Sequence, residues 1–162
     1  MAGERAVAYL ISKGRLEGFT AEDPGVVAEA LLERATLRVG TSARAALDGG
    51  DVEGAFVLAY DAYRMAAESL LAAQGLRATG GDGSHMTVED AVSAQFGKEI
   101  PAFAKATFER FRRMRHSAQY LDLSAAPITD QDASWAIEKA TTALARTRQF
   151  LTGAVLERFV SD

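Results

Sequence analysis

The 162-residue chain contains no cysteine and only two histidines. The absence of cysteine excludes disulfide bonds, thiolate catalysis and zinc or iron–sulfur sites built on cysteine. His85 and His116 are therefore the only side chains whose ordinary pKa lies near neutral pH. We expect no metal site and no cofactor.

An excess of basic residues and long apolar runs are lacking as well. The net charge is -4 and the pI is about 5.3, which argues against a protein that binds nucleic acid over its whole surface. We find no helix-turn-helix spacing and expect no DNA partner. The N-terminus has no signal-peptide pattern, and no apolar run approaches the ~18 residues of a membrane span. We therefore expect a cytoplasmic protein without membrane association.

Patterns typical of β-strands are also missing, because no alternating Val, Ile or Thr runs stand between turn residues. Apolar residues recur three and four positions apart instead, which is the spacing of a buried helix face. An apolar content of 48% is sufficient to bury one core. We predict an all-α helical bundle of about four long helices plus short helices. It forms a single domain over 1–162, with a short helix and loop at 1–23 and the bundle at 25–160.

Capping residues and breaks in the apolar pattern give the expected helix limits. Asp23, Asp51 and Thr129 are good N-cap residues and precede three of the long helices. The core face of the third and fourth long helices is expected to include Phe111, Leu121 and Val155. The predicted long helices cover residues 24–47, 52–74, 99–121 and 130–155.

A glycine-rich connection separates the second long helix from a short one. Residues 77–86 are predicted to form a flexible loop, and Thr87 with Asp90 is expected to cap the short helix. Residues 80–83 lack the Lys-Ser/Thr of a P-loop and follow a helix, so they are not expected to bind phosphate. His85 is expected to be exposed to solvent or to cap the helix.

The most basic part of the chain lies late in the third long helix. Residues 98–116 contain six Lys or Arg and two Glu, a local charge of +4 in an acidic protein. Helical spacing predicts that several polar side chains share one side of this helix. We interpret this side as a candidate anion-binding patch, which includes Arg112, Arg115, His116, Gln119 and Tyr120.

The chemistry of this patch leaves three interpretations open. Arg115 offers a fork for phosphate, His116 can take or give a proton, and Tyr120 can donate a hydrogen bond or stack on a base. This set suits cleavage of an RNA phosphodiester, and it equally suits passive binding of phosphate. It also suits an ordinary surface helix, because Glu109 has i, i+4 partners in Lys105 and Arg113.

Two segments on separate helices resemble the HEPN superfamily: Ala-Tyr-Asp-Ala-Tyr-Arg at 59–64 and Arg-His-Ser-Ala-Gln-Tyr at 115–120. Family members carry an arginine, a polar residue, three further residues and a histidine. Arg115 matches the arginine, His116 matches the polar residue, and Tyr120 stands where the histidine is expected. The supporting residues that we carry over from the first segment are Tyr60, Asp61 and Arg64.

The resemblance implies a homodimer in which the arginine and histidine of two subunits face each other and cut RNA without a metal. A phenol with a pKa of ~10 is neutral at pH 7, so His116 takes the acid–base role in this scheme. Arg115 then stabilises the phosphate and Tyr120 positions the substrate. Arg110 is an alternative partner of His116. The residues expected to contact RNA or phosphate are Arg110, Arg112, Arg113 and Gln119.

The leading hypothesis is a HEPN-like homodimer that binds RNA or a nucleotide phosphate, with metal-independent endoribonuclease activity in a toxin–antitoxin or defence system. An alternative is a non-catalytic interaction module or antitoxin-like partner. It predicts that Arg112, Arg115 and Tyr120 are buried against Asp61, Glu68 or another chain. A further alternative is a nucleotide-binding helical bundle with its pocket between helices, which predicts stabilisation by ATP or GTP.

Overall fold

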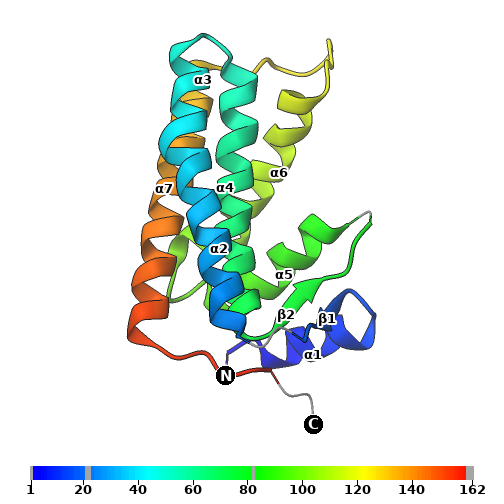
Figure 1. The fold of residues 1–162 in the computed structure, drawn as a ribbon. Helices are drawn as coiled ribbons and strands as arrows, with labels where there is room; N and C mark the ends of the chain where they lie inside the picture. The colour runs from blue at the N-terminus through cyan, green and yellow to red at the C-terminus, as the bar shows by residue number, and fades with distance from the viewer. Residues whose placement is uncertain (1, 21–22, 82, 160–162) are drawn as a thin grey trace.

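The computed structural model describes residues 2–20, 23–81 and 83–159 (Figure 1). It confirms the all-α bundle, in which four long helical elements run alongside one another. The end of the predicted bundle at residue 160 and position 82 of the predicted loop lie outside the described residues. The four elements are α2 (Pro24–Leu37), α4 (Val52–Ala73), α6 (Lys105–Gln119) and α7 (Asp130–Gly153).

The predicted N-caps are present. Asp23 accepts a hydrogen bond from the backbone N–H of Gly25, and Asp51 accepts one from Gly54. Thr129 and Asp132 form a reciprocal capping box at the start of α7. After α2 the chain continues through a π-helical segment, η1 (Arg38–Ala43), into α3 (Arg44–Asp48). The helical stretch from 24 to about 47 is therefore confirmed, with a local change of winding in its middle.

Helix α4 is the centre of the molecule, because α2, α5, α6 and α7 all pack on it. Its contacts are most extensive with α2 and α7, where small side chains allow a close approach of the helices. Most of its circumference is therefore buried. The fully buried alanines of α4 are Ala55, Ala59, Ala62, Ala66 and Ala67.

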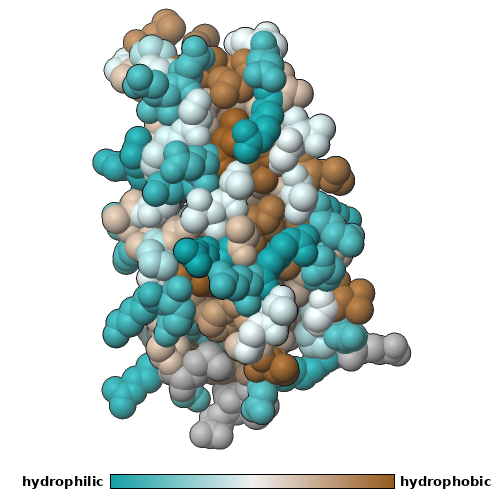
Figure 2. Space-filling model, turned by 90° about the vertical axis from the view of Figure 1, so that its left-hand side faces the viewer, coloured by the Kyte–Doolittle hydropathy of each residue, from teal (hydrophilic) through white to brown (hydrophobic). Residues whose placement is uncertain are grey.

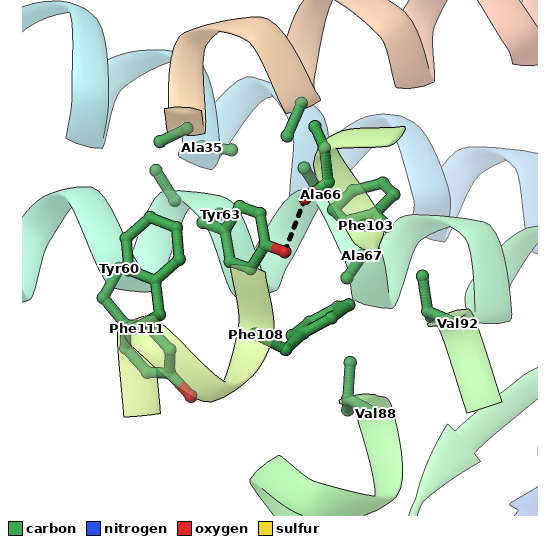
Figure 3. Packing of buried hydrophobic residues seen from close by; sticks show 14 of the residues in the cluster. Ala35, Tyr60, Tyr63, Ala66, Ala67, Val88, Val92, Phe103, Phe108 and Phe111 are labelled. Atoms are coloured by element: carbon green, nitrogen blue, oxygen red, sulfur yellow. Dashed lines mark hydrogen bonds between the residues drawn. The ribbon is translucent and has the colours of Figure 1, made fainter. Parts of the chain in front are cut away.

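An aromatic cluster joins α4 to α6 (Figure 3). Tyr63 of α4 stacks on Phe111 of α6 with ring centroids 4.3 Å apart, and Phe108 meets the Tyr63 ring edge-on at 4.9 Å. The Tyr63 hydroxyl donates a hydrogen bond of 2.7 Å to the backbone carbonyl of Ala102, so its buried polar atom is satisfied. Trp135 of α7 packs 4.7 Å from Phe111 and extends the cluster. This cluster fixes how α6 lies against α4.

The structure contains one small two-stranded sheet, although the sequence shows no strand pattern. β1 (Leu16–Gly18) follows α1 (Glu4–Ser12), and β2 (Leu76–Ala78) follows α4. The two strands pair antiparallel. Gly75 adopts a φ of +72° at the sharp turn from α4 into β2, a conformation that favours glycine. Three residues per strand are too few to produce an alternating pattern, so the sequence carries no strand signal here.

The start of the next helix also differs from the prediction. α5 (Ser84–Phe96) begins three residues before Thr87, which lies inside the helix and donates to the carbonyl of Gly83. Gly83 occupies the N-cap position with a φ of +88°. Residues 77–86 are therefore not one flexible loop, since they contain the end of β2 and the first turn of α5.

The third long helix is shorter than predicted. Pro101 begins a short 3-10 helix, η2 (Pro101–Phe103), and extended backbone at Ala104 separates it from α6. α6 ends at Gln119, so Leu121 falls in the following loop and is 92% exposed. Val155 lies beyond the end of α7 and is 94% exposed. The predictions of Leu121 and Val155 as core residues were wrong, because the helical register that would bury them stops before they are reached.

The face that α2 and α7 present is mainly hydrophilic, with hydrophobic residues in separate patches (Figure 2). An ion pair of 2.7 Å between Arg148 of α7 and Glu29 of α2 crosses this face. Within the described parts of the chain, no helix is both long enough and apolar enough to span a membrane. The buried apolar side chains of these helices, such as Leu32 and Ile137, belong to the core.

Replacement of Phe111 by Ala is expected to lower the free energy of unfolding by about 3–5 kcal/mol, because it leaves a cavity among four aromatic rings. Val155→Ala is the matched control and is expected to change it by less than ~0.5 kcal/mol. Urea unfolding followed by circular dichroism measures both. Equal effects of the two substitutions would contradict the described core.

Candidate functional site

A buried tyrosine and a half-buried histidine form the centre of the site. The Tyr60 hydroxyl of α4 lies 2.7 Å from Nδ1 of His85, in the first turn of α5, and the two rings are stacked. Burial raises the pKa of Tyr60 to about 12, so its hydroxyl keeps its proton at pH 7. Burial, with the charges of Arg64 and Arg115, lowers the pKa of His85 to about 4. The protonated Tyr60 hydroxyl can donate to Nδ1 of the neutral imidazole, and in that arrangement the ring proton is on Nε2.

Two arginines flank this pair. The guanidinium carbon of Arg115, on α6, lies 5.3 Å from the centroid of the Tyr60 ring. Arg64 follows Tyr60 by one turn of α4, and its charge acts on both Tyr60 and His85. The Nε atoms of both arginines are buried and find no hydrogen-bond partner among the described residues. We call Tyr60, Arg64, His85 and Arg115 the Tyr60–His85 cluster.

Two carboxylates stand beside the cluster. Glu68 pairs with Arg64 at 3.4 Å across one turn of α4, and Glu89 of α5 pairs with Arg112 of α6 at 3.3 Å. The Glu89 side chain is only 3% exposed, and burial raises the pKa of both carboxyl groups. Arg115 has no ion pair within the described residues. The cluster therefore presents more donors and positive charge than the neighbouring carboxylates satisfy.

A groove opens next to the cluster, and Arg64 belongs to both. The groove lies between α2, α4, β2 and the start of α5, and its volume is about 520 Å³. This size is within the range of small-molecule sites. Arg64 and Glu68 are among its polar lining residues, and we call it the α2–α4 groove. Its main apolar lining residues are Phe19, Val27, Leu31, Leu71 and Leu76.

The structure brings only some of the predicted site residues together. Arg115, Tyr60 and Arg64 meet in the cluster, although the last two were expected only as supporting residues. Asp61 faces another direction and pairs with Arg38 of η1 at 3.4 Å. Arg112 lies beside the cluster and is held by Glu89.

The other predicted residues lie on the exposed side and at the end of α6. Arg113, His116, Gln119 and Tyr120 are exposed, and the rings of His116 and Tyr120 pack on each other at 5.2 Å. Arg110 lies over the Trp135 ring, with its guanidinium carbon 3.9 Å from the ring centroid. His116 and Tyr120 therefore have surroundings different from those of Arg115.

The prediction that His85 is exposed or caps a helix was wrong, and sequence reasoning missed it as a site residue. Its partner Tyr60 lies 25 positions earlier in the chain. Glycines at positions 80, 81 and 83 precede His85 in sequence, which indicates a loop and gives no helical face. Only the packing of α5 against α4 brings the two rings together.

The site offers no metal-binding set. No group of three or more His, Asp or Glu residues within 2–20, 23–81 and 83–159 is arranged to hold a metal ion. What the site offers is two cations, a neutral imidazole and a phenol. These groups suit an anion whose oxygens accept several hydrogen bonds, and phosphate is such an anion.

The depressed pKa of His85 predicts a pH dependence of stability. Between about pH 6.5 and 4 the unfolded chain protonates this histidine while the folded chain does not, so stability falls as the pH falls through this window. His85→Gln keeps a hydrogen-bonding group and removes this titration. Urea unfolding at several pH values is expected to show that the free energy of unfolding falls more steeply with falling pH in the wild type than in the variant. An equal pH dependence in the two proteins would contradict the assignment of a neutral, half-buried imidazole.

No family model, curated protein or solved structure matched the chain in the comparisons made. The resemblance to the HEPN superfamily therefore rests on the two short segments at 59–64 and 115–120 and on the helical architecture. Those two segments contribute three of the four residues of the Tyr60–His85 cluster. The function is accordingly argued from the geometry of this cluster.

Proposed function

We propose that this protein is a HEPN-like phosphate-binding protein whose Tyr60–His85 cluster holds a phosphate group of RNA or of a nucleotide. One observation carries the proposal: the buried Nε atoms of Arg64 and Arg115 have no partner among the described residues. A buried donor without an acceptor costs free energy, and a bound phosphate oxygen removes that cost. Charge supports the same ligand, because Arg115 lacks a carboxylate partner within the part of the chain described.

Each member of the cluster has a role in holding the phosphate. Arg64 and Arg115 approach from different helices and supply charge-assisted hydrogen bonds. The neutral His85 ring offers its Nε2–H as a further donor, because Tyr60 already occupies Nδ1. Burial is the main cause of the low pKa of His85, and the charges of Arg64 and Arg115, which attract an anion, lower it further.

Arg115→Ala is expected to weaken binding of a fluorescent single-stranded RNA by about tenfold or more, because a charge-assisted hydrogen bond in a half-buried site is lost. Arg113→Ala is the matched control, since it removes the same charge from an exposed position of the same helix. It is expected to change the affinity by less than about threefold at 0.15 M salt. Fluorescence anisotropy measures both affinities.

Equal losses in the two variants would show that RNA binds through general charge and would contradict a phosphate site in the cluster. No binding by the wild type to RNA, to nucleotides or to inorganic phosphate would overturn the proposed function altogether. Circular dichroism of each variant before the assay separates lost binding from lost folding.

A second candidate function is metal-independent cleavage of RNA. In this reaction His85, which is paired with Tyr60, is a better candidate for the acid–base group than the exposed His116. In this reaction the 2′-hydroxyl gives its proton to Tyr60 while Tyr60 passes its own proton to Nδ1 of His85. The 2′-oxygen bonds to phosphorus, the bond to the 5′-oxygen breaks, and the leaving oxygen takes the proton back through Tyr60. The bound phosphate offsets the arginine charges, which raises the pKa of His85 towards its ordinary value.

Incubation with mixed RNAs in EDTA tests this second function. Cleavage is expected in the wild type and is expected to be lost in His85→Gln, whereas His116→Gln retains it. Loss of activity in His116→Gln alone would return the catalytic role to the exposed histidine. Absence of cleavage in the wild type would leave phosphate binding without catalysis.

We propose that the homodimer forms through the end of α6 and the loop that follows it. Three large apolar side chains are exposed within four residues: Tyr120 at 56%, Leu121 at 92% and Leu123 at 91%. Their exposure is unfavourable in a monomer and is relieved by burial against a second copy. The same surface carries the exposed His116 and Gln119.

Light scattering is expected to give twice the monomer mass for the wild type. Introduction of a charge by Leu121→Glu is expected to shift the protein to the monomer, because a buried unpaired carboxylate is costly. Leu37→Glu, at a position that is 64% exposed on α2, is the control and is expected to leave the mass unchanged. A monomeric wild type would contradict the dimer.

A further inference from the structure

The lining of the α2–α4 groove includes one carboxylate, that of Glu68. Glu68 lines the groove together with Arg64, and the two side chains pair at 3.4 Å. Other polar residues of the lining are already engaged: Arg77 donates to Glu17 at 2.7 Å, and the Thr79 hydroxyl donates to the carbonyl of Gly14 at 2.8 Å. A ligand in the groove therefore meets apolar walls, the Glu68–Arg64 pair and the Ser84 hydroxyl.

The groove and the Tyr60–His85 cluster are adjacent along one helix. Tyr60, Arg64 and Glu68 follow one another at intervals of four residues on α4, so each step advances by about 6 Å on the same face. Arg64 stands between the other two along the helix, with Nη1 paired with Glu68 and with a buried Nε that has no partner among the described residues. A ligand whose phosphate lies in the cluster can extend the group attached to that phosphate into the groove.

The hydrogen-bonding pattern of the groove selects among nucleobases. An ionised carboxylate only accepts hydrogen bonds, and its two oxygens suit two neighbouring donors. Guanine presents such a pair, N1–H and the N2 amino group, on its Watson–Crick edge. Adenine and cytosine place an acceptor nitrogen beside their amino group, and uracil places carbonyl oxygens on both sides of its single N–H. The flat apolar face of any base suits the walls formed by Leu31 and Leu71, so the Glu68–Arg64 pair determines which base is preferred.

We propose that the α2–α4 groove is a guanine-binding subsite, in which Glu68 accepts from N1–H and the N2 amino group while Arg64 donates to O6. This inference rests on the proposed function, because the phosphate of the same nucleotide occupies the Tyr60–His85 cluster. Glu68 is then the residue that determines base specificity, and Arg115 is a residue that binds the phosphate common to all nucleotides.

Binding of GMP, IMP, AMP and UMP to the full chain tests the subsite by isothermal titration calorimetry. GMP is expected to bind about tenfold more tightly than AMP and UMP, because only guanine satisfies both carboxylate oxygens. IMP lacks only the N2 amino group and is expected to lie between GMP and AMP. Equal affinities for the four nucleotides would overturn the inference without any variant being made.

Glu68→Gln tests the role of the carboxylate directly. The ratio of GMP to AMP affinity is expected to fall about tenfold, to near one, because the amide presents a donor to one of the two guanine N–H groups. The ratio is the quantity to compare, since loss of the Glu68 charge also frees Arg64 and changes the affinity for every phosphate. An unchanged ratio in Glu68→Gln would overturn the assignment of Glu68.

Arg115→Ala and the nucleoside guanosine separate this inference from the proposed function. Arg115→Ala is expected to lower the affinities for GMP and AMP by the same factor and to leave the weak binding of guanosine unchanged. Equal binding of GMP and AMP that is lost in Arg115→Ala overturns the guanine subsite and supports the phosphate site. Binding of guanosine as tight as that of GMP supports the groove and overturns the phosphate site.

Discussion

The burial of α4 on most of its circumference is the constraint on which the rest of the structure depends. A helix surrounded by α2, α5, α6 and α7 has little access to solvent, so its small residues set the spacing of its neighbours. The buried polar groups of α4 must therefore find hydrogen-bond partners among the surrounding helices. Tyr60 finds His85 and Arg64 finds Glu68, yet the Nε of Arg64 and that of Arg115 stay without an acceptor among the described residues. The proposed phosphate site follows from that imbalance.

Much of the fold could be predicted because its signals are local. Asp23, Asp51 and Thr129 mark helix starts through hydrogen bonds to residues two or three positions away. The strands β1 and β2 could not be predicted, since their pairing joins residues about 60 positions apart over only three residues each. Leu121 fits the apolar spacing of α6 but lies beyond its end, where extended backbone begins at Tyr120. Periodicity identifies a helix more reliably than it locates the helix end.

Only the part of the site that lies within a single helix could be predicted from the sequence. Arg115 could be predicted because it lies in a basic run and matches the arginine of the family motif. His116 and Tyr120 share that spacing but point to solvent, whereas His85 reaches the cluster from another helix. A pattern within one segment cannot show which side chain of a distant segment will face it. Because His85 and not His116 lies beside Arg115, we place the proposed phosphate site among these half-buried residues and not on the exposed side of α6.

The central claim is that Arg64 and Arg115 direct buried Nε–H donors at a phosphate. Nuclear magnetic resonance of the arginine Nε–H groups, recorded while inorganic phosphate is added, tests this claim most directly. The account predicts that the Nε–H resonances of Arg64 and Arg115 shift together and saturate, while that of the exposed Arg113 stays in place. Saturating shifts at Arg113 with unchanged resonances for Arg64 and Arg115 would contradict it.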